Sequence, residues 1–473
     1  MGEQGRDAFN RERAEHWERV HSKSTPSTGW YYHRFLRKVY ARQIPPGQRV
    51  LDLGCGTGEL LAATRPSFGM GVDISARAVE LARGRFPDLH FSVADAADYR
   101  FEGEPFDYVI LSDLVNDLWD VQEVLMRLRG HCHPRTRIIL NAYSHVWQLP
   151  LQLARRLGLA RPLLPQNWLT KEDIRNLMQL SGFESLRTWP ELLLPTALPG
   201  ADTVNRIVAR FAPFRWFCLT NFYVCRPIAP TVAAASCSII VAARNESGKI
   251  HELIRRIPDI CSDQEVVFVE GGSTDDTYAV IEDAIRQAPP GRFRLIRQPG
   301  KGKGDAVRAG FGVARGDILM ILDADMTVAP EDLRLFYDAM VRGYGEFVNG
   351  VRLVYPMEQE AMRFFNLLGN KFFAFAFSWL LGQPVRDTLC GTKVLWRSEY
   401  EKIASNRSQF GDFDPFGDFD LLFGAARLNL RILEIPVRYG ARTYGSTNIS
   451  RWSHGWLLLR MTLFAARKIK FGR

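Results

Sequence analysis

The sequence predicts an α/β protein of two doubly wound domains, and three observations support this prediction. The chain has 473 residues, which exceeds the ordinary size of one domain. Short, continuous apolar runs alternate twice with helical patterning, and runs that are apolar on both faces are typical of parallel strands covered by helices. A segment rich in proline and alanine, 227–236, separates the two alternations. We therefore expect domains at 1–226 and 237–473, joined by this linker.

Composition and charge exclude several classes of protein. Hydrophobic residues make up 46% and charged residues 24% of the chain, a globular mixture that excludes a disordered or collagen-like protein. The net charge of +9 is spread along the chain, so it indicates anionic partners such as phosphates or lipid headgroups and no nucleic acid. Seven cysteines without a C-x-x-C pair favour reduced thiols in a cytoplasmic protein. The charged beginning of the chain does not resemble a signal peptide.

The first alternation opens with a strand that runs into a glycine-rich turn. Residues 51–58 read L-D-L-G-C-G-T-G, and the G-x-G-x-G spacing differs from the G-x-G-x-x-G of dinucleotide-binding proteins, which disfavours NAD. Acids end the first three predicted strands: Asp52 would lie near a ligand amino group, Asp73 near ribose hydroxyls and Asp95 near an adenine edge. Acids that merely cap helices are the alternative. The predicted cofactor-binding residues are Asp52, Gly54, Gly56, Gly58, Asp73 and Asp95.

Over residues 28–185 this pattern resembles the class I S-adenosylmethionine-dependent methyltransferases. The resemblance implies a Rossmann-like domain that binds S-adenosylmethionine, with the glycine turn against the methionine part of the cofactor. The methyl acceptor would lie beyond the fourth and fifth predicted strands, where Asp113, Tyr143 and His145 follow. One of these side chains could take a proton from the acceptor, and helix-capping or surface roles remain open for each of them.

The second alternation contains a buried strand that ends in two carboxylates. Residues 318–322 are continuously apolar and run into Asp323-Ala324-Asp325. Two carboxylates beyond an apolar strand are costly unless they bind something, and hard oxygen ligands suit Mg²⁺ or Mn²⁺. Asp325, with Asp323, would hold this ion against a substrate diphosphate, and Lys303 in the K-G-K-G turn would add a positive charge. A helix N-cap and a solvated turn are the alternatives.

Over residues 236–450 the chain resembles the family-2 glycosyltransferases of the GT-A fold, in particular the dolichol-phosphate mannosyltransferase type. V-A-A-R-N-E at 241–246, E-G-G-S-T-D-D-T at 270–277 and the D-A-D motif match, although that family usually has Asp-Asp where this chain has Glu270-Gly271. The resemblance implies metal-dependent, inverting transfer of a sugar from a UDP- or GDP-linked nucleotide sugar to a polyprenyl phosphate or other lipid or glycan acceptor. The residues implied for the nucleotide sugar are Ala243, Asn245, Glu246, Glu270, Lys303, Asp323 and Arg442.

The same resemblance assigns residues to the acceptor side. Arg352, Arg363 and Lys393 occupy positions where the family carries basic residues near the acceptor phosphate, and a surface ion pair is the alternative for each arginine. An acceptor that is already a phosphate needs no strong general base, whereas a hydroxyl acceptor would need one. Asp387 or Asp418 would then be the candidate base. The implied catalytic residues are Asp325, Asp387 and Asp418.

Two apolar segments bear on membrane contact. Residues 364–381 are rich in phenylalanine and leucine but contain asparagine and lysine, which favours a buried or interfacial helix over a membrane span. Near the end of the chain, a helical stripe precedes a basic segment. Its members are Trp452, Trp456, Leu459 and Leu463. Peripheral association with the inner face of a membrane and ordinary core packing both remain open for these segments.

These patterns lead to a bifunctional enzyme as the principal hypothesis. A methyltransferase domain would be fused to a glycosyltransferase domain, and both would act in one glycan or glycolipid pathway. The alternative is a small-molecule methyltransferase whose second domain binds a nucleotide sugar without transferring it. The Glu270-Gly271 departure permits this alternative, whereas the retained carboxylates of the D-A-D motif favour transfer.

Overall fold

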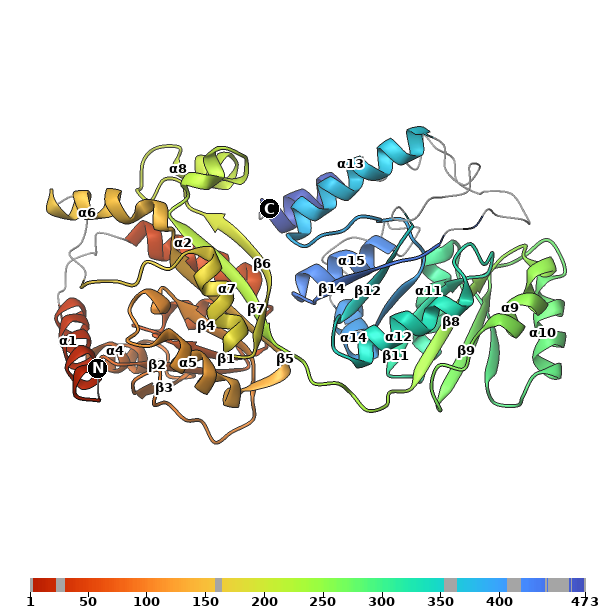
Figure 1. Ribbon diagram of the computed structural model, residues 1–473, viewed down its shortest axis with the longest axis horizontal. Helices are drawn as coiled ribbons and strands as arrows, with labels where there is room; N and C mark the ends of the chain where they lie inside the picture. Colours follow the sequence, from red (N-terminus) through yellow and green to blue (C-terminus); the bar gives the residue numbers. More distant parts are fainter. Residues whose placement is uncertain are drawn as a thin grey trace. The chain divides into compact units, whose positions relative to one another are not determined.

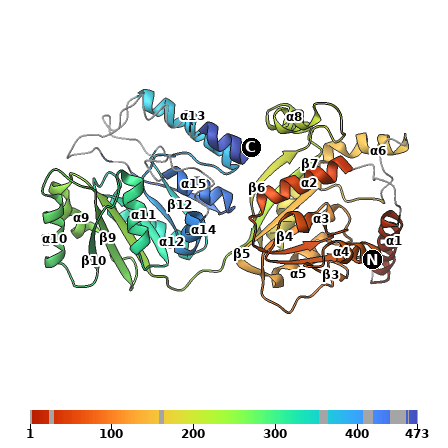
Figure 2. The same ribbon diagram turned by 180° about the vertical axis from the view of Figure 1, so that it is seen from behind.

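The computed structural model describes residues 3–22, 30–157, 164–352, 364–405, 418–438, 440, 459–460 and 462–471. The chain divides into two compact units, Met1–Ile228 and Ala229–Arg473 (Figure 1; Figure 2 gives the view from behind). Each unit contains one seven-stranded sheet with helices on both faces, which confirms the predicted class of two α/β domains.

The sheet of the first unit has the strand order β3-β2-β1-β4-β5-β7-β6. Strands β1 to β5 run parallel, whereas β7 pairs antiparallel with both β5 and β6. The strand order reverses between β1 and β4, and in open parallel sheets a ligand binds beyond the carboxyl ends of the strands at such a point. The strands are β1 Arg49–Leu53, β2 Phe68–Asp73, β3 His90–Val93, β4 Phe106–Ser112, β5 Cys132–Tyr143, β6 Phe183–Glu191 and β7 Thr220–Pro227.

Helices sandwich this sheet because its strands are apolar on both faces. One face packs against α2, α3 and α4, and the other packs against α5 and α7. Helices α1, α6 and α8 lie outside these two layers (Figure 1). The helices are α1 Glu3–His21, α2 Trp30–Gln43, α3 Glu59–Ala63, α4 Ala76–Arg85, α5 Val121–Leu128, α6 Gln148–Arg156, α7 Lys171–Leu180 and α8 Ala201–Arg206.

The sheet of the second unit has the order β10-β9-β8-β11-β13-β12-β14. Strand β13 runs antiparallel to both neighbours, and the other pairs are parallel. The register therefore brings the carboxyl ends of β8, β9 and β11 to one edge of the sheet. The strands are β8 Cys237–Ala243, β9 Gln264–Glu270, β10 Phe293–Arg297, β11 Ile318–Asp323, β12 Phe347–Val351, β13 Lys393–Trp396 and β14 Ile432–Pro436.

Two helical layers also enclose the second sheet. One face packs against α9, α10 and α12, and the other packs against α11, α13, α14 and α15. The helices are α9 Ile250–Arg256, α10 Thr277–Gln287, α11 Lys303–Val313, α12 Leu333–Val341, α13 Phe364–Leu381, α14 Arg397–Ser405 and α15 Asp418–Arg427.

The segments that the sequence analysis related to membranes are only partly described. None of the described helices is long and apolar enough to cross a membrane. The end of α13 is core, because Phe377 and Leu381 are fully buried, whereas Phe375 earlier in the helix is 75% exposed. Trp452 and Trp456 lie outside the described residues.

Candidate functional sites

The glycine-rich turn follows β1 and is held by the acid that ends β2. Gly54, Gly56 and Gly58 all have positive φ, a conformation that side chains disfavour. The Gly56 amide donates to one Asp73 oxygen (2.8 Å), and the Ser75 amide donates to the other (2.9 Å). A carboxylate has about four acceptor positions, so Asp73 retains capacity for ligand hydroxyls.

Asp52 is the carboxyl group in this site that most needs a ligand. Its side chain is 1% exposed, and neither oxygen has a hydrogen-bond partner among the described residues. Burial, followed by the charge of Asp73, raises the pKa of Asp52 well above its usual value. An orphaned buried carboxyl group is costly, and an ammonium group from a ligand would remove that cost.

A cavity of 1580 Å³ joins most of the predicted cofactor residues. Ligand pockets commonly have volumes of about 300–1,000 Å³, so this cavity has room for a cofactor and an acceptor together. Gly58 does not line it. Its Cα packs against the ring of Phe91, where a Cβ atom would clash, so Gly58 allows close helix packing. The predicted cofactor residues in the wall are Asp52, Gly54, Gly56, Asp73 and Asp95.

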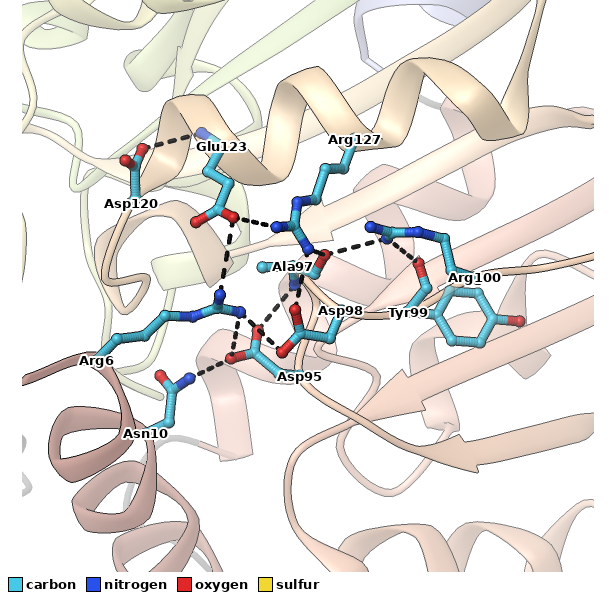
Figure 3. Close-up of polar contacts among 10 residues, drawn as sticks. All are labelled: Arg6, Asn10, Asp95, Ala97, Asp98, Tyr99, Arg100, Asp120, Glu123 and Arg127. Carbon is cyan, nitrogen blue, oxygen red and sulfur yellow. Dashed lines mark hydrogen bonds and ion pairs between the residues drawn. The ribbon is translucent and has the colours of Figure 1, made fainter. Parts of the chain in front are cut away.

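Helix α1 attaches to Asp95, which the sequence analysis placed at the adenine edge (Figure 3). Asn10 donates to one Asp95 oxygen, and the Arg6 guanidinium lies 3.5 Å from the same oxygen. Arg6 also pairs with Asp98 (2.8 Å). The Ala97 amide donates to the other Asp95 oxygen (2.8 Å). Helix α1 therefore forms a wall of the cavity at the end of β3.

A second pair of contacts attaches the same helix beyond β4. The Arg13 guanidinium lies 3.0 Å from one oxygen of Asp117, and Trp17 Nε1 donates to the other (2.9 Å). Sequence reasoning missed Arg6, Asn10, Arg13 and Trp17. Their helix is mostly charged and has no apolar stripe that would mark it as part of a site.

Asp113 lines the part of the cavity where the sequence analysis expected a methyl acceptor. Its backbone is left-handed (φ 56°), and its Oδ1 accepts hydrogen bonds from Tyr32 Oη (2.7 Å) and Asn141 Nδ2 (2.6 Å). Burial raises the pKa of Asp113 to about 7, and these two donors oppose the rise. Tyr143 also lines the cavity, whereas His145 is exposed and lies outside the lining. The structure therefore brings two of the three acceptor-side candidates together.

In the second unit, polar loops follow the aligned ends of β8 and β9. Ala243 is paired in register with Glu270, and its carbonyl accepts from the Gly271 amide (3.0 Å). Asn245 has a left-handed backbone (φ 57°), and its side-chain oxygen accepts from the Thr274 amide (2.8 Å). Glu246, which follows it, is buried. These contacts join the two motifs that the sequence analysis assigned to a nucleotide sugar.

Gly271 stands where the family usually has an aspartate, and little space is left there for a side chain. A Cβ atom at Gly271 would lie 3.0 Å from the side-chain oxygen of Gln298 and 3.4 Å from Cβ of Arg244. Glu270 instead directs one oxygen to the Ser273 amide (2.6 Å). The loop therefore requires a residue without a large side chain at position 271. Glu270 stabilises the same loop through its hydrogen bond with Ser273.

The two carboxylates after β11 have different partners. Asp323 Oδ1 lies 2.5 Å from Lys303 Nζ. Burial would raise the pKa of Asp323, and the charges of Lys303, Lys393 and Arg352 outweigh it, so the pKa is lowered. Asp325 Oδ1 accepts from the Thr327 amide (3.1 Å) and hydroxyl (2.9 Å). Its other oxygen has no hydrogen bond among the described residues.

This donor set fits a metal ion that is shared with a substrate. Among the described residues, no group of three side chains of the metal-binding types comes together. Mg²⁺ commonly binds through one or two carboxylates plus substrate phosphates and water, so the open oxygen of Asp325 suffices as a protein ligand. The Asp323 oxygen bonded to Lys303 is less suited, because an ammonium group occupies its position.

Gly391 lies directly against the Asp323–Lys303 ion pair, and the sequence analysis did not assign it a role. A Cβ atom on Gly391 would overlap both the Asp323 carboxylate and the Lys303 ammonium. The signal was present, because Gly391 belongs to the D-T-L-C-G-T-K motif at 387–393. The motif alone did not show that its glycine meets the end of β11.

The predicted acceptor-side residues form internal contacts. Arg352 binds Asp387 through two bonds, Nε to Oδ2 (2.7 Å) and Nη2 to Oδ1 (2.9 Å). Burial would raise the pKa of Asp387, but the contacts with Arg352 and the Leu389 amide together outweigh burial, so the pKa is lowered. Lys393 is fully buried, and its ammonium donates to the Cys390 carbonyl. Arg363, Arg442 and the side chain of Asp418 lie outside the described residues.

The two sheets, each with polar residues at the carboxyl ends of its parallel strands, define a protein with two α/β domains. A family model described as "Methyltransferase domain" matches residues 30–188, and one described as "Glycosyl transferase family 2" matches residues 238–402. The first unit therefore contains a methyltransferase domain and the second a family-2 glycosyltransferase domain. Both family resemblances, the Rossmann-like and GT-A-like folds and the two enzyme classes are confirmed.

Individual relatives match one unit at a time. Glycosyltransferase AglJ from Haloferax volcanii is 28% identical over 210 residues, which cover 43% of this chain and 65% of AglJ. Polyprenol monophosphomannose synthase from Mycolicibacterium smegmatis is 27% identical over 219 residues, covering 45% of this chain and 80% of the synthase. Among solved structures, magnesium protoporphyrin IX methyltransferase from Synechocystis, with bound SAH, has a TM-score of 0.33 at 20% identity, covering 47% of this chain and 97% of that one.

Proposed function

We propose that the protein is a bifunctional enzyme with one activity in each unit. Residues 1–226 would transfer a methyl group from S-adenosylmethionine. Residues 237–473, after the linker 227–236, would transfer a sugar from a nucleotide sugar to a polyprenyl phosphate or a related acceptor. The glycosyl half is supported by the family match and by a relative named as a polyprenol monophosphomannose synthase. The methyl half is supported by the family match and by the orphaned Asp52 in the cavity wall.

The residues of the first cavity suit the separate parts of S-adenosylmethionine. Asp52 would accept the amino group, the remaining acceptor positions of Asp73 would take the ribose hydroxyls, and Asp95 would meet the adenine amino group. The bound cofactor supplies an electrophilic methyl carbon. Transfer to an aligned acceptor is a displacement in which positioning provides much of the acceleration, and α1 and the glycine turn provide that positioning here.

Asp113 is the proposed proton acceptor for methyl transfer. Its Oδ1 is held by Tyr32 and Asn141, so Oδ2 is the oxygen left to receive the proton of an acceptor hydroxyl or amine. A base works best when its pKa is near the working pH, and burial places the pKa of Asp113 at about 7. Tyr143, which lines the same cavity, would help to orient the acceptor.

In the second unit, Asp325 would hold Mg²⁺ or Mn²⁺ against the diphosphate of the donor. The metal ion, when bound, neutralises the leaving nucleoside diphosphate. Asn245, Glu246 and Glu270 shape the neighbouring loops for the nucleotide, and Arg442 is proposed to join them. Lys303 would keep Asp323 ionised. The sugar-transfer assay described below tests both UDP- and GDP-linked donors.

The state of Asp387 favours a phosphate acceptor over a hydroxyl acceptor. A strong general base should have an accessible oxygen and a pKa near neutrality, but Asp387 is buried, ion-paired with Arg352 and lowered in pKa. An acceptor phosphate is already an anion and does not need such a base. Arg363 and Asp418 remain proposed acceptor-side residues, and Arg352 and Lys393 would act there through their buried positive charges.

The test is transfer of labelled sugar into an organic phase. The full chain is incubated with polyprenyl phosphate, Mg²⁺ or Mn²⁺ and labelled UDP- and GDP-sugars. We expect metal-dependent label that Asp325→Asn lowers by about a thousandfold, and that Asp283→Asn, on the exposed surface of α10, leaves unchanged. Label that persists in Asp325→Asn would contradict the proposal. Nucleotide binding without transfer to any acceptor would instead support a non-catalytic nucleotide-sugar module.

A further inference from the structure

Helix α6 and the residue that follows it expose three leucines on the outer side of the methyltransferase unit. Leu149, Leu153 and Leu157 are four residues apart, so they fall on one helical face, and they are 74%, 59% and 63% exposed. Leu151 and Arg155 lie on the opposite side and line the cavity. Helix α6 thus separates the cavity from solvent and presents its more apolar side outward, which is unusual for a solvated helix.

An aromatic segment continues this apolar surface. Trp147 Nε1, directly before α6, donates to the Phe217 carbonyl (2.8 Å), which places the end of the segment 211–217 beside the start of the helix. Trp216 is 65% exposed in this segment. Figures 1 and 2 both place α6 at the same end of the first unit as α8, which precedes the segment. We call the combined surface the α6 face. Its exposed apolar members are Val146, Leu149, Leu153, Leu157, Phe211, Phe214, Trp216 and Phe217.

The charged side chains within the two segments of the α6 face are basic. Residues 144–157 and 207–217 contain no aspartate or glutamate. Arg156 is exposed and Arg215 is half-buried among the aromatic side chains. Arginine can lay its apolar stem along such a surface while its guanidinium reaches outward. The two segments thus combine leucine, tryptophan and phenylalanine with basic side chains, and Asp173, in the first turn of α7, lies within electrostatic range of His145.

We propose that the α6 face docks on an anionic lipid bilayer. Leucine and aromatic side chains would enter the boundary between headgroups and acyl chains, and the arginines would meet anionic headgroups. Charge complementarity favours this occupant over a second copy of the chain, which would bring the same cations together. Docking would place the wall made by Leu151 and Arg155 next to the bilayer. The methyl acceptor would then be a molecule held at a lipid surface.

The proposal concerns the first unit and does not depend on glycosyl transfer. The test is co-sedimentation of the full chain with phosphatidylcholine vesicles, with and without phosphatidylglycerol. We expect binding to the anionic vesicles, weakened by salt. The double variant Leu149→Glu/Leu153→Glu should lose about tenfold or more in vesicle affinity. Arg156→Gln and Arg215→Gln should each lose about fivefold.

Matched variants separate this face from general effects of charge. Leu180→Glu, at a leucine of α7 that is 67% exposed, and Arg286→Gln, on the exposed side of α10, should bind vesicles like the wild type. Quenching of tryptophan fluorescence by brominated lipid should decrease in Trp216→Phe. Equal quenching in the wild type and Trp216→Phe would show that the segment stays out of the bilayer and would overturn the proposal.

Three further outcomes would overturn the proposal. The wild type could ignore anionic vesicles, the double variant could bind them as well as the wild type, or the face could be covered by a second copy. In the last case the wild type would be a dimer and the double variant a monomer. Failure here is distinguishable from failure of the proposed function. The double variant should still transfer sugar to detergent-solubilised polyprenyl phosphate, and Asp325→Asn should still bind vesicles.

Discussion

In the first unit, Asp52 and Asp73 stand together without an ion pair in the described part of the chain, whereas in the second unit Asp323 and Asp387 are paired with Lys303 and Arg352. Burial is the largest influence on all four carboxyl groups. Only the second site supplies cations that outweigh burial, so pKa values rise in the first site and fall in the second.

The contrast matches the charges of the proposed ligands. S-adenosylmethionine carries an ammonium and a sulfonium group, which can neutralise unpaired acids. A nucleotide sugar is an anion, so acids near its diphosphate must be neutralised by protein cations or a metal ion. On the proposed function, the ligand would complete the first site, whereas the protein's own side chains would largely complete the second.

The first test of this contrast concerns the Asp323–Lys303 ion pair of the second site. Gly391→Ala should push Asp323 and Lys303 apart, because its Cβ would overlap both groups. A displacement of about 1 Å in an active site can cost about a hundredfold in rate, so we expect sugar transfer to fall by that order. The measurement is the organic-phase assay, with Gly312→Ala as control because its Cβ would meet no atom within 4 Å. Full activity in Gly391→Ala would show that the pair is not part of the site.

The second prediction concerns Asp52, the buried carboxyl group of the first site, which has no ion pair among the described residues. Because Asp52 has a raised pKa in the folded protein, its contribution to stability is present at low pH and is lost as pH rises. Asp52→Asn should therefore raise the melting temperature of the ligand-free protein at neutral pH and weaken binding of S-adenosylhomocysteine by about tenfold or more. Calorimetry measures both, with the exposed Asp88→Asn as control. A less stable variant with unchanged affinity would contradict this assignment.

A smaller effect concerns the helix that covers the first cavity. Arg6→Ala/Asn10→Ala removes the α1 side chains that contact Asp95 (Figure 3). We expect S-adenosylhomocysteine to dissociate about fivefold faster, as for the loss of one or two net hydrogen bonds. Stopped-flow release can be compared with Arg11→Ala, at an exposed position of the same helix. Equal release rates for the two variants would show that α1 does not retain the cofactor.

A further prediction concerns pH dependence. Asp113 has a folded pKa of about 7, above its unfolded value of about 4, so its contribution to stability is full below pH ~4 and is lost as pH rises towards 7. Across this window the free energy of unfolding of Asp113→Asn should fall less with rising pH than that of the wild type. Urea unfolding at several pH values measures the difference. Parallel pH profiles would rule out a raised pKa at Asp113.

Sequence patterns predicted those strands of both folds that are marked by apolar runs along the chain. Strands β1 to β5 and β8 to β12 were predicted from short, mostly apolar runs, and the acids Asp73, Glu270 and Asp323 are the last residues of β2, β9 and β11. Strands β6, β7, β13 and β14 were missed. All four contain polar residues or proline, and β13 has only four residues, Lys393–Trp396, so its apolar run is too short to stand out.

The partners of the site residues were harder to predict than their positions. The Arg352–Asp387 pair joins residues 35 positions apart, and the contact of α1 with Asp95 spans 85 positions. No local spacing encodes such contacts. Lys393 was assigned to an acceptor phosphate, but its position in a central antiparallel strand buries it. Because the sequence did not reveal that β13 runs antiparallel, it did not show which of its side chains are buried and which could face a ligand.

The most direct test of the contrast between the two sites is the number of protons exchanged when S-adenosylhomocysteine binds. Titration calorimetry in buffers of different ionisation enthalpy measures that number. Binding of the ligand's ammonium group should ionise Asp52, so we predict proton release at neutral pH that largely disappears in Asp52→Asn. Binding without proton release, or the same release in Asp52→Asn, would contradict the claim that this carboxyl group is completed by its ligand.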